Sequence, residues 1–350
     1  MNLRELSDLL GLSPTTVSRA LGGYPEVSAE TRRRVRAAAA EHDYRPNRRA
    51  AALATGRAMA IGHVIPTDRG NEMVNPIFAD FIAGAGEVYA QGGYDMTMSV
   101  VSDGDEATAY RQLALDRGVD GMIVHGPRQD DTRLAVLRET GTPFVVHGRV
   151  PGCGLDYDFV DVDNVRAFRR ATDVLLDLGH RRIGLLNGPA HMDFACRRRE
   201  GFLAALDARG IAIAPARLHH SEMSERAGYE AVAADLASDT PSTAFVVASL
   251  IMALGARRAL QDAGLAIGRD VSLVTHDDML SYLSNDGEVP LFTATRSSVR
   301  AAGRRCAEIL LARILAPETP PVQEIWESEL VLGGSTGPVA DPPSRPRNGG

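Results

Sequence analysis

The sequence predicts a chain of two parts: an N-terminal all-α helix-turn-helix head and an α/β body of two doubly wound parallel-sheet lobes. Two short helical segments joined by a glycine turn begin the chain. From residue 58 onward, short β-rich runs alternate with amphipathic helical runs. Charge is segregated along the chain. Residues 1–57 hold ten Arg against six Asp or Glu and are basic, whereas the whole chain has a net charge of −7. A basic head on an acidic body is typical of a module that binds a polyanion.

The composition is that of a folded protein with more than one domain. A length of 350 residues suits two or three domains, and 44% hydrophobic with 24% charged residues argues against global disorder. No apolar run reaches the roughly 20 residues of a membrane span, and the N-terminus lacks a signal-peptide core. Cys153, Cys196 and Cys306 form no CxxC pair, which argues against a disulfide framework and a structural zinc. We therefore expect a cytoplasmic protein without metal, cofactor or membrane partner.

The head begins with two short helices separated by a tight turn. Residues 3–10 carry apolar side chains at helical spacing, and Asn2 and Glu5 have the spacing of a capping box. Gly11 is a natural end for this helix. Ser13 followed by proline predicts the start of a second helix over residues 14–21.

A third helix is expected from the cap residue Ser28 to about Asp43. In a helix-turn-helix, the N-terminal part of the second helix reads base edges in the major groove. Arg can bind guanine with two hydrogen bonds, and Thr offers a hydroxyl and a methyl group. A plain three-helix bundle with a solvated polar face stays open as an alternative. The candidate base-reading side chains are Thr15, Thr16, Ser18 and Arg19. The small core is expected from Leu6, Leu10, Val17, Leu21, Val35 and Ala39.

The body is predicted to alternate strands with helices, which implies parallel sheets with right-handed crossovers. Ligands of such sheets bind at the carboxyl ends of the strands, here in the cleft between the lobes. The expected strands are 60–65, 95–101, 121–125, 144–147, 182–186, 244–248 and 272–275. The expected helices are 77–91, 107–117, 131–139, 165–178, 198–209 and 251–263.

Signals for catalysis are weak. Gly84 and Gly86 begin like a dinucleotide-binding motif, but Tyr89 stands where the third glycine is required, and the run falls in the middle of a helix. Helix packing is the better interpretation. The sequence contains no P-loop and no GxSxG motif. An acidic run is interpreted as a strand with one solvated edge rather than a cation site: Asp156, Asp158, Asp161 and Asp163.

The head resembles that of a LacI/GalR-type transcriptional regulator. The resemblance rests on LSPTTVSRAL at 12–21, VSAETRRRV at 27–35 and YRPN at 44–47. RRAAALATG at 48–56 resembles the hinge helix of that family, in which two hinge helices pair on operator DNA and a Leu enters the minor groove. Leu53 matches that Leu. The expected DNA-contacting residues are Pro14, Thr15, Thr16, Ser18, Arg19, Asn47 and Leu53.

The resemblance continues through the body to about residue 332. It rests on NPIF at 75–78, VDGMI at 119–123, LGHRRIG at 178–184, RREGF at 198–202, MALG at 252–255 and HDD at 276–278. It implies a fold like that of periplasmic binding proteins, with a sugar-like effector held in the cleft. Arg198 would donate from its planar guanidinium, and Asp277 would accept from paired hydroxyls. The implied effector contacts are Phe78, His147, Arg149, Arg198, Met223, Ser249 and Asp277.

The predicted organisation follows from these matches. The expected segments are a DNA-binding domain at 1–45, a hinge helix at 46–57, a body at 58–336 and a disordered tail at 337–350. The first lobe is expected at 58–160 and 292–320, and the second at 161–291 and 321–336. The tail contains no heptad repeat that could form a tetramerisation zipper, so a homodimer formed through the body, on a pseudo-palindromic operator, is expected.

The predicted function is that of a sugar-responsive transcriptional repressor. The segments HGR at 147–149 and SEMSERAGY at 221–229 are similar to those of alpha-glucoside-type members of the family. Two other classes of protein fit the sequence less well. A binding protein that delivers sugar to a transporter is opposed by the basic head. An enzyme on a doubly wound fold is opposed by the lack of a nucleophile or cofactor motif.

Overall fold

The structure is a computed structural model that describes residues 1–22, 24, 26–44, 57–66, 75–102, 104–116, 118–154 and 156–339. Within these ranges, no helix is long and apolar enough to cross a membrane. Asn47, Leu53 and most of the predicted hinge and tail lie outside the described residues. Residues 337–339, expected to be disordered, are held to the body. Gly337 N donates to Ser272 Oγ at 3.0 Å, and Val339 N donates to Leu178 O at 3.0 Å.

The head is a three-helix unit, as predicted: α1 (Leu3–Leu10), α2 (Pro14–Leu21) and α3 (Ala29–Glu41). The capping box at α1 is present, with Glu5 N donating to Asn2 Oδ1 at 3.0 Å. Gly11 ends α1 in the left-handed conformation that glycine favours, with φ 62°. Leu21 is only partly buried, whereas Tyr44 joins the core. The buried residues that close this core are Leu6, Leu10, Val17, Ala20, Val27, Val35, Ala38, Ala39 and Tyr44.

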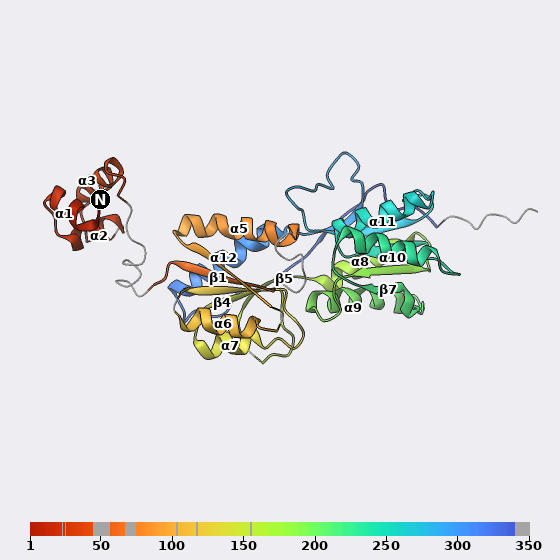
Figure 1. Cartoon of the computed structure of the whole chain (residues 1–350). Coiled ribbons are helices and arrows are strands. Elements are labelled where there is room, and N and C mark those ends of the chain that lie inside the picture. The colour runs from red at the N-terminus through yellow and green to blue at the C-terminus, as the bar shows by residue number, and fades with distance from the viewer. Residues whose placement is uncertain are drawn as a thin grey trace, which may run out of the picture. The chain divides into compact units, whose positions relative to one another are not determined.

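The first lobe of the body is a parallel sheet covered on both faces by helices. In Figure 1, α5 and α12 lie on one face of this sheet, and α6 and α7 lie on the other. The strand order is β11-β5-β4-β3-β1-β2. The strands are β1 (Ala60–Pro66), β2 (Asp95–Val101), β3 (Gly121–His125), β4 (Phe144–His147), β5 (Asp158–Val162) and β11 (Gln323–Trp326). The helices are α5 (Pro76–Gly92), α6 (Glu106–Leu115), α7 (Arg133–Thr140) and α12 (Val299–Leu315).

The second lobe repeats this architecture in the order β12-β10-β9-β8-β6-β7, with β12 antiparallel to β10 at the edge. Helix α8 packs against α9, and α10 packs against α11. The strands are β6 (Ile183–Asn187), β7 (Leu218–His220), β8 (Ala244–Val247), β9 (Ser272–Asp277), β10 (Thr293–Arg296) and β12 (Glu329–Val331). The helices are α8 (Asn164–Asp177), α9 (Asp193–Asp207), α10 (Glu225–Leu236), α11 (Leu250–Asp262) and the 3-10 turn Pro215–Arg217.

The chain changes lobes later than the sequence predicted. Strand β10 pairs with β9 in the second sheet, although residues 292–320 were assigned to the first lobe. Strand β11 pairs with β5 in the first sheet, although residues 321–336 were assigned to the second lobe. Both strands are only four residues long. Strands this short carry too little pattern to show which sheet they join, and their pairing partners decide it.

Close helix packing explains the glycines that resemble a nucleotide-binding motif. Gly84 lies within α5 against α12, where an added Cβ would overlap the carbonyl oxygen of Arg300. Gly303 on α12 faces the carbonyl oxygen of Phe81 in the same way. The two helix backbones therefore approach each other directly, which confirms the packing interpretation.

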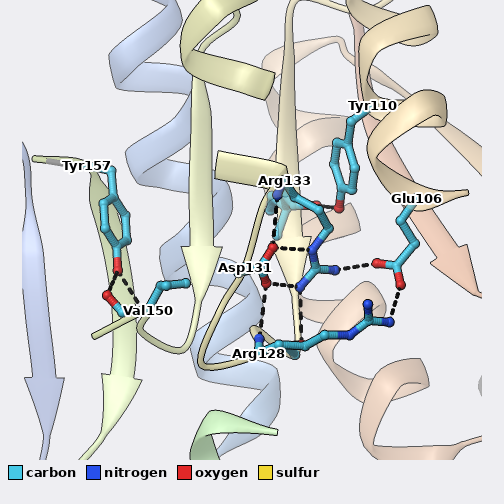
Figure 2. Close-up of polar contacts among 9 residues, drawn as sticks. Glu106, Tyr110, Arg128, Asp131, Arg133, Val150 and Tyr157 are labelled. Carbon is cyan, nitrogen blue, oxygen red and sulfur yellow. Dashed lines mark hydrogen bonds and ion pairs between the residues drawn. The ribbon is translucent and has the colours of Figure 1, made fainter. Parts of the chain in front are cut away.

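A buried ion cluster holds the loop that follows β3 (Figure 2). Arg133 Nη1 donates to Glu106 Oε2 at 2.6 Å, and Arg133 Nε donates to Asp131 Oδ1 at 2.8 Å. Arg128 Nη2 donates to the second oxygen of Glu106 at 2.8 Å. Burial raises the pKa of Asp131, but the Arg133 guanidinium outweighs this effect and the pKa lies below its ordinary value. The loop between Arg128 and Arg133 is therefore held by fully paired charges.

Candidate functional site

Helix α2 presents a polar face to solvent at its N-terminal end. Ser13 caps the helix by accepting a hydrogen bond from Thr16 N at 3.1 Å. The Thr16 hydroxyl lies 2.8 Å from the Ser13 hydroxyl, so it is already engaged within the cap. Val17 and Ala20 are buried against the other helices and fix the rotation of α2. The exposed members of the predicted DNA-contacting set on this helix are Pro14, Thr15, Ser18 and Arg19.

A cavity of about 170 Å³ lies between the two lobes, at the carboxyl ends of their strands. A single water needs roughly 10–15 Å³ of such space, so the cavity can hold a small organic molecule. Four of the predicted effector contacts line it: Phe78, His147, Arg198 and Met223. Three others lie outside its lining: Arg149, Ser249 and Asp277.

Arg198 on α9 is a buried cation of this cavity. Its Nε donates to Asn164 Oδ1 at 2.7 Å, and its Nη1 donates to Ala248 O at 2.8 Å. The rings of Phe168 and Phe194 lie with centroids 5.0 and 4.8 Å from its Cζ. Burial lowers the pKa of Arg198 to about 10, so it remains charged at neutral pH. No described residue accepts a hydrogen bond from Nη2, which leaves that group for a ligand.

The carboxylate that faces Arg198 in the cavity belongs to Asp278, not to Asp277. Burial raises the pKa of Asp278 to about 7, although Arg198 opposes this shift. Asp277 instead accepts from Met279 N at 2.8 Å and lies 3.2 Å from Arg296 Nε. The sequence prediction was one residue away from the cavity side chain, because neighbouring residues at a strand end point to opposite sides.

Aromatic rings of the first lobe form the opposite wall. Phe78 and Phe81 present edges to the His125 ring, with centroids 5.1 and 4.9 Å away. Phe81 also lies 4.5 Å from the His147 ring. Burial lowers the pKa of His147 to about 4, so this imidazole is neutral at pH 7. These aromatic side chains are therefore uncharged and offer ring surfaces to an apolar part of a ligand.

Arg149 and Ser249 support the cavity from behind its surface. Arg149 Nε donates to Asp161 Oδ2 at 2.6 Å, and it is Asp161 that lines the cavity. Burial raises the pKa of Asp161, and Arg149 limits that rise. Ser249 is fully buried and caps α11 by accepting a hydrogen bond from Met252 N at 3.2 Å. Arg149 therefore contacts Asp161 and does not itself line the cavity.

Several polar cavity residues were absent from the sequence prediction. His125 ends a strand that the sequence placed correctly, and Asn164 directly precedes the predicted helix 165–178. Residues at the carboxyl ends of the predicted strands could therefore have been selected as candidates. In the described part of the chain, no group of three His, Cys, Asp or Glu side chains could hold a metal ion. The cavity residues missed by sequence reasoning include His125, Asp161, Asn164, Asp193 and Asp278.

Comparison with known proteins bears on both parts of the chain. Residues 2–47 match the family of bacterial regulatory proteins, lacI family, and residues 172–336 match a periplasmic binding protein-like domain. A helix-turn-helix head joined to such a two-lobed body defines a DNA-binding regulator that carries its own ligand-binding domain.

Full-length relatives identify the family. The chain is 46% identical to the HTH-type transcriptional regulator AglR of Rhizobium meliloti (strain 1021), over 97% of this chain and 96% of the relative. It is 33% identical to the HTH-type transcriptional regulator RafR of Escherichia coli, over 96% and 98%. The solved lac repressor dimer bound to operator and an anti-inducer matches with TM-score 0.80 and 27% identity, over 96% of this chain and 99% of that chain. The chain belongs to the LacI family and is a sequence-specific DNA-binding transcriptional regulator.

Proposed function

We propose that this chain is a repressor whose affinity for its operator is controlled by a small neutral sugar bound between the lobes. The observation that carries the proposal is the pairing of two unlike cavity walls. Arg198 and Asp278 of the second lobe offer a donor group and an ionisable carboxyl, while Phe78 and the neutral histidines of the first lobe offer ring surfaces. Sugars combine apolar ring faces with paired hydroxyls, so one sugar can pack against the rings of the first lobe and hydrogen-bond to the polar groups of the second lobe.

The balance of charge favours a neutral ligand over a sugar phosphate. Asp161 is paired with Arg149, and Asp193 is paired with Arg197 at 2.5 Å. Arg198 is the remaining buried cation in the lining, and Asp278 lies opposite it. A phosphate brings one to two negative charges, which Arg198 alone would have to neutralise after desolvation.

Relatives support the ligand class and the assembly. A related regulator has been solved as a CelR–cellobiose complex, with TM-score 0.68 and 28% identity over 96% of this chain and 99% of that chain. The lac repressor has been solved as a dimer on its operator. By analogy, we propose a homodimer that binds a pseudo-palindromic operator in the cytoplasm and binds its sugar without chemical turnover. The segments that are similar to those of alpha-glucoside-type regulators make maltose and trehalose the first sugars to test.

Control of DNA binding requires that the sugar bind two lobe arrangements with different affinity. The contacts from the cavity residues come from both lobes, so a change in lobe arrangement alters the set of contacts that the sugar can make. Arg198 from α9 belongs to the second lobe and Phe78 from α5 to the first, so these two side chains line the cavity from opposite lobes. The sugar therefore favours the arrangement in which both can contact it.

The test is a thermal-shift screen followed by operator binding. Glucose, maltose, trehalose, cellobiose and glucose 6-phosphate are each titrated against the full chain, because a specific ligand raises the unfolding temperature by mass action. The proposal expects at least one neutral sugar to stabilise the protein more than glucose 6-phosphate and to change operator affinity at the same concentrations. A protein stabilised only by the phosphate would contradict the ligand class. A sugar that binds without any effect on operator affinity would contradict the coupling.

A further inference from the structure

A chain of three polar side chains runs through the first lobe to the cavity, the first two buried and the third half-buried. It begins at Tyr89 on α5, passes His63 on β1 and ends at His125 on β3. Tyr89 Oη lies 3.2 Å from His63 Nε2, and His63 Nδ1 lies 2.8 Å from His125 Nε2. Tyr89 and His63 are buried at 2% and 0% exposure, so water does not compete for these hydrogen bonds.

All three groups are neutral at pH 7. Burial lowers the pKa of His63 to about 3 and lowers that of His125 well below its ordinary value. Burial also raises the pKa of Tyr89 well above its ordinary value, so the phenol keeps its proton. A neutral imidazole has one N–H donor and one acceptor nitrogen. The positions of the protons along the chain are therefore linked, and only two arrangements are consistent.

In the first arrangement, Tyr89 donates to His63 Nε2, and His63 donates from Nδ1 to His125 Nε2. His125 then carries its proton on Nδ1. In the second arrangement every bond is reversed, and the Tyr89 hydroxyl accepts from His63. Its own hydrogen would then point into a buried region where, among the described residues, Tyr89 Oη makes no hydrogen bond other than the one to His63. Leaving a buried hydroxyl hydrogen without an acceptor is unfavourable, so the first arrangement is the stable one.

The remaining nitrogen of His125 faces open space. His125 lines the cavity, and among the described residues its Nδ1 has no hydrogen-bond partner. Nδ1 is not one of the buried polar atoms that lack a hydrogen-bond partner, so it is accessible from the cavity. The rings of Phe78 and Phe81 that surround His125 offer no competing polar group.

We propose that His125 donates a hydrogen bond from Nδ1 to an oxygen of the bound sugar. Tyr89, acting through His63, holds His125 in the tautomer whose Nδ1 carries the proton. The sugar contact rests on the proposed function, because that function supplies the ligand. The assignment of the proton to His125 Nδ1 does not depend on the proposed function. His125 is thereby a residue that determines specificity, because it selects an acceptor oxygen at one position of the ligand. Tyr89 and His63 are positioning residues that never touch the ligand.

The proton assignment is tested by nitrogen-15 NMR of histidine-labelled full-length protein, with His125 identified from the spectrum of His125→Gln. We expect a protonated Nδ1 and an unprotonated Nε2 in the wild type. Tyr89→Phe should shift both His125 nitrogens toward averaged values. Tyr110→Phe is the matched control, because Tyr110 is also buried beside β3 but donates to the backbone oxygen of Ile123 at 3.1 Å and not to a histidine nitrogen. A protonated Nε2 in the wild type, or an unchanged His125 spectrum in Tyr89→Phe, would overturn the inference.

The ligand contact is tested with maltose, trehalose and cellobiose by calorimetry. His125→Leu should weaken the sugar that binds best by about tenfold, as expected for one lost hydrogen bond, and His125→Gln should retain part of the affinity. Tyr89→Phe should weaken binding about two- to threefold, because the donor form is then only partly populated. Wild-type affinity in His125→Leu would overturn the contact. If no sugar binds the wild type, the proposed function fails together with the contact, while the spectra still decide the proton assignment.

Discussion

Asp278 should make the stability of this protein fall as the pH rises from about 5 toward 7. Its carboxyl is buried at the cavity opposite Arg198, and its pKa is raised from 3.8 to about 7. In the unfolded chain the same carboxyl ionises near its ordinary value. Between pH 5 and pH 7, folded Asp278 therefore keeps a proton that the unfolded chain has released. A group that binds its proton more tightly when folded stabilises the protein at low pH, and that contribution is lost as the pH rises.

The size of the effect follows from the width of this window. Each pH unit across which one proton separates the two states changes the free energy of unfolding by about 1.4 kcal/mol. Two units predict a loss of about 2–3 kcal/mol from this group between pH 5 and pH 7. The side chain of Asp278 is 13% exposed, so solvent screening reduces this figure only modestly.

The assay is urea unfolding of the wild type and Asp278→Asn at pH 5, 6, 7 and 8. The asparagine variant cannot titrate, so its stability relative to the wild type should increase by about 2–3 kcal/mol between pH 5 and pH 7. Asp207→Asn is the control, because it makes the same charge change at an exposed position of α9. Because other titrating groups are common to all three proteins, the differences isolate this carboxyl. A difference between Asp278→Asn and the wild type that stays constant with pH would refute the reasoning.

Three further predictions concern the head, the cavity and the fold. Arg198→Ala should abolish the response of operator binding to sugar while operator affinity without sugar stays within roughly tenfold, about 1.4 kcal/mol; a normal midpoint and amplitude in a gel-shift titration would place the effector elsewhere. Arg19→Ala should lower operator affinity by about 1–3 kcal/mol and relax discrimination at one base pair, whereas an equal loss on operator and random DNA would indicate a phosphate contact. Gly84→Ala should destabilise the body by about 1–3 kcal/mol in thermal unfolding, because its Cβ would meet the α12 backbone. Gly86→Ala, where the nearest atom is 3.9 Å away, should be neutral or slightly stabilising, and equal effects of the two changes would refute this account.

Local signals predicted the head and most of the body. Capping residues and a glycine turn define α1 and α2 within a few neighbouring residues, and the structure confirms them. The ends of β3 and β4, at His125 and His147, were also predicted, because buried strands of this length have a clear apolar run. These features depend on nearby residues, so the sequence displays them directly.

Features that depend on distant partners could not be predicted in this way. Asp158 and Asp161 were expected on a solvated strand edge, but both are buried, at 3% and 5% exposure. Asp158 pairs with Arg313 at 2.7 Å, and Asp161 pairs with Arg149. Arg313 lies 155 residues from its partner, and no local pattern indicates that contact. That Asp278 and not Asp277 lines the cavity could not be predicted for a related reason, since one residue of register at a strand end decides which side chain enters the cavity.

The measurement that tests the central claim most directly is the reciprocity of sugar and operator binding. If one chain couples its cavity to its DNA-binding head, the factor by which the sugar changes operator affinity must equal the factor by which operator changes sugar affinity. Both factors are measured on the same full-length protein, by fluorescence anisotropy with labelled operator and by calorimetry with the sugar found in the screen. We predict equal factors of about 5- to 150-fold, as is typical of allosteric proteins. A sugar affinity that is the same with and without saturating operator, while the sugar changes operator affinity, would contradict the account.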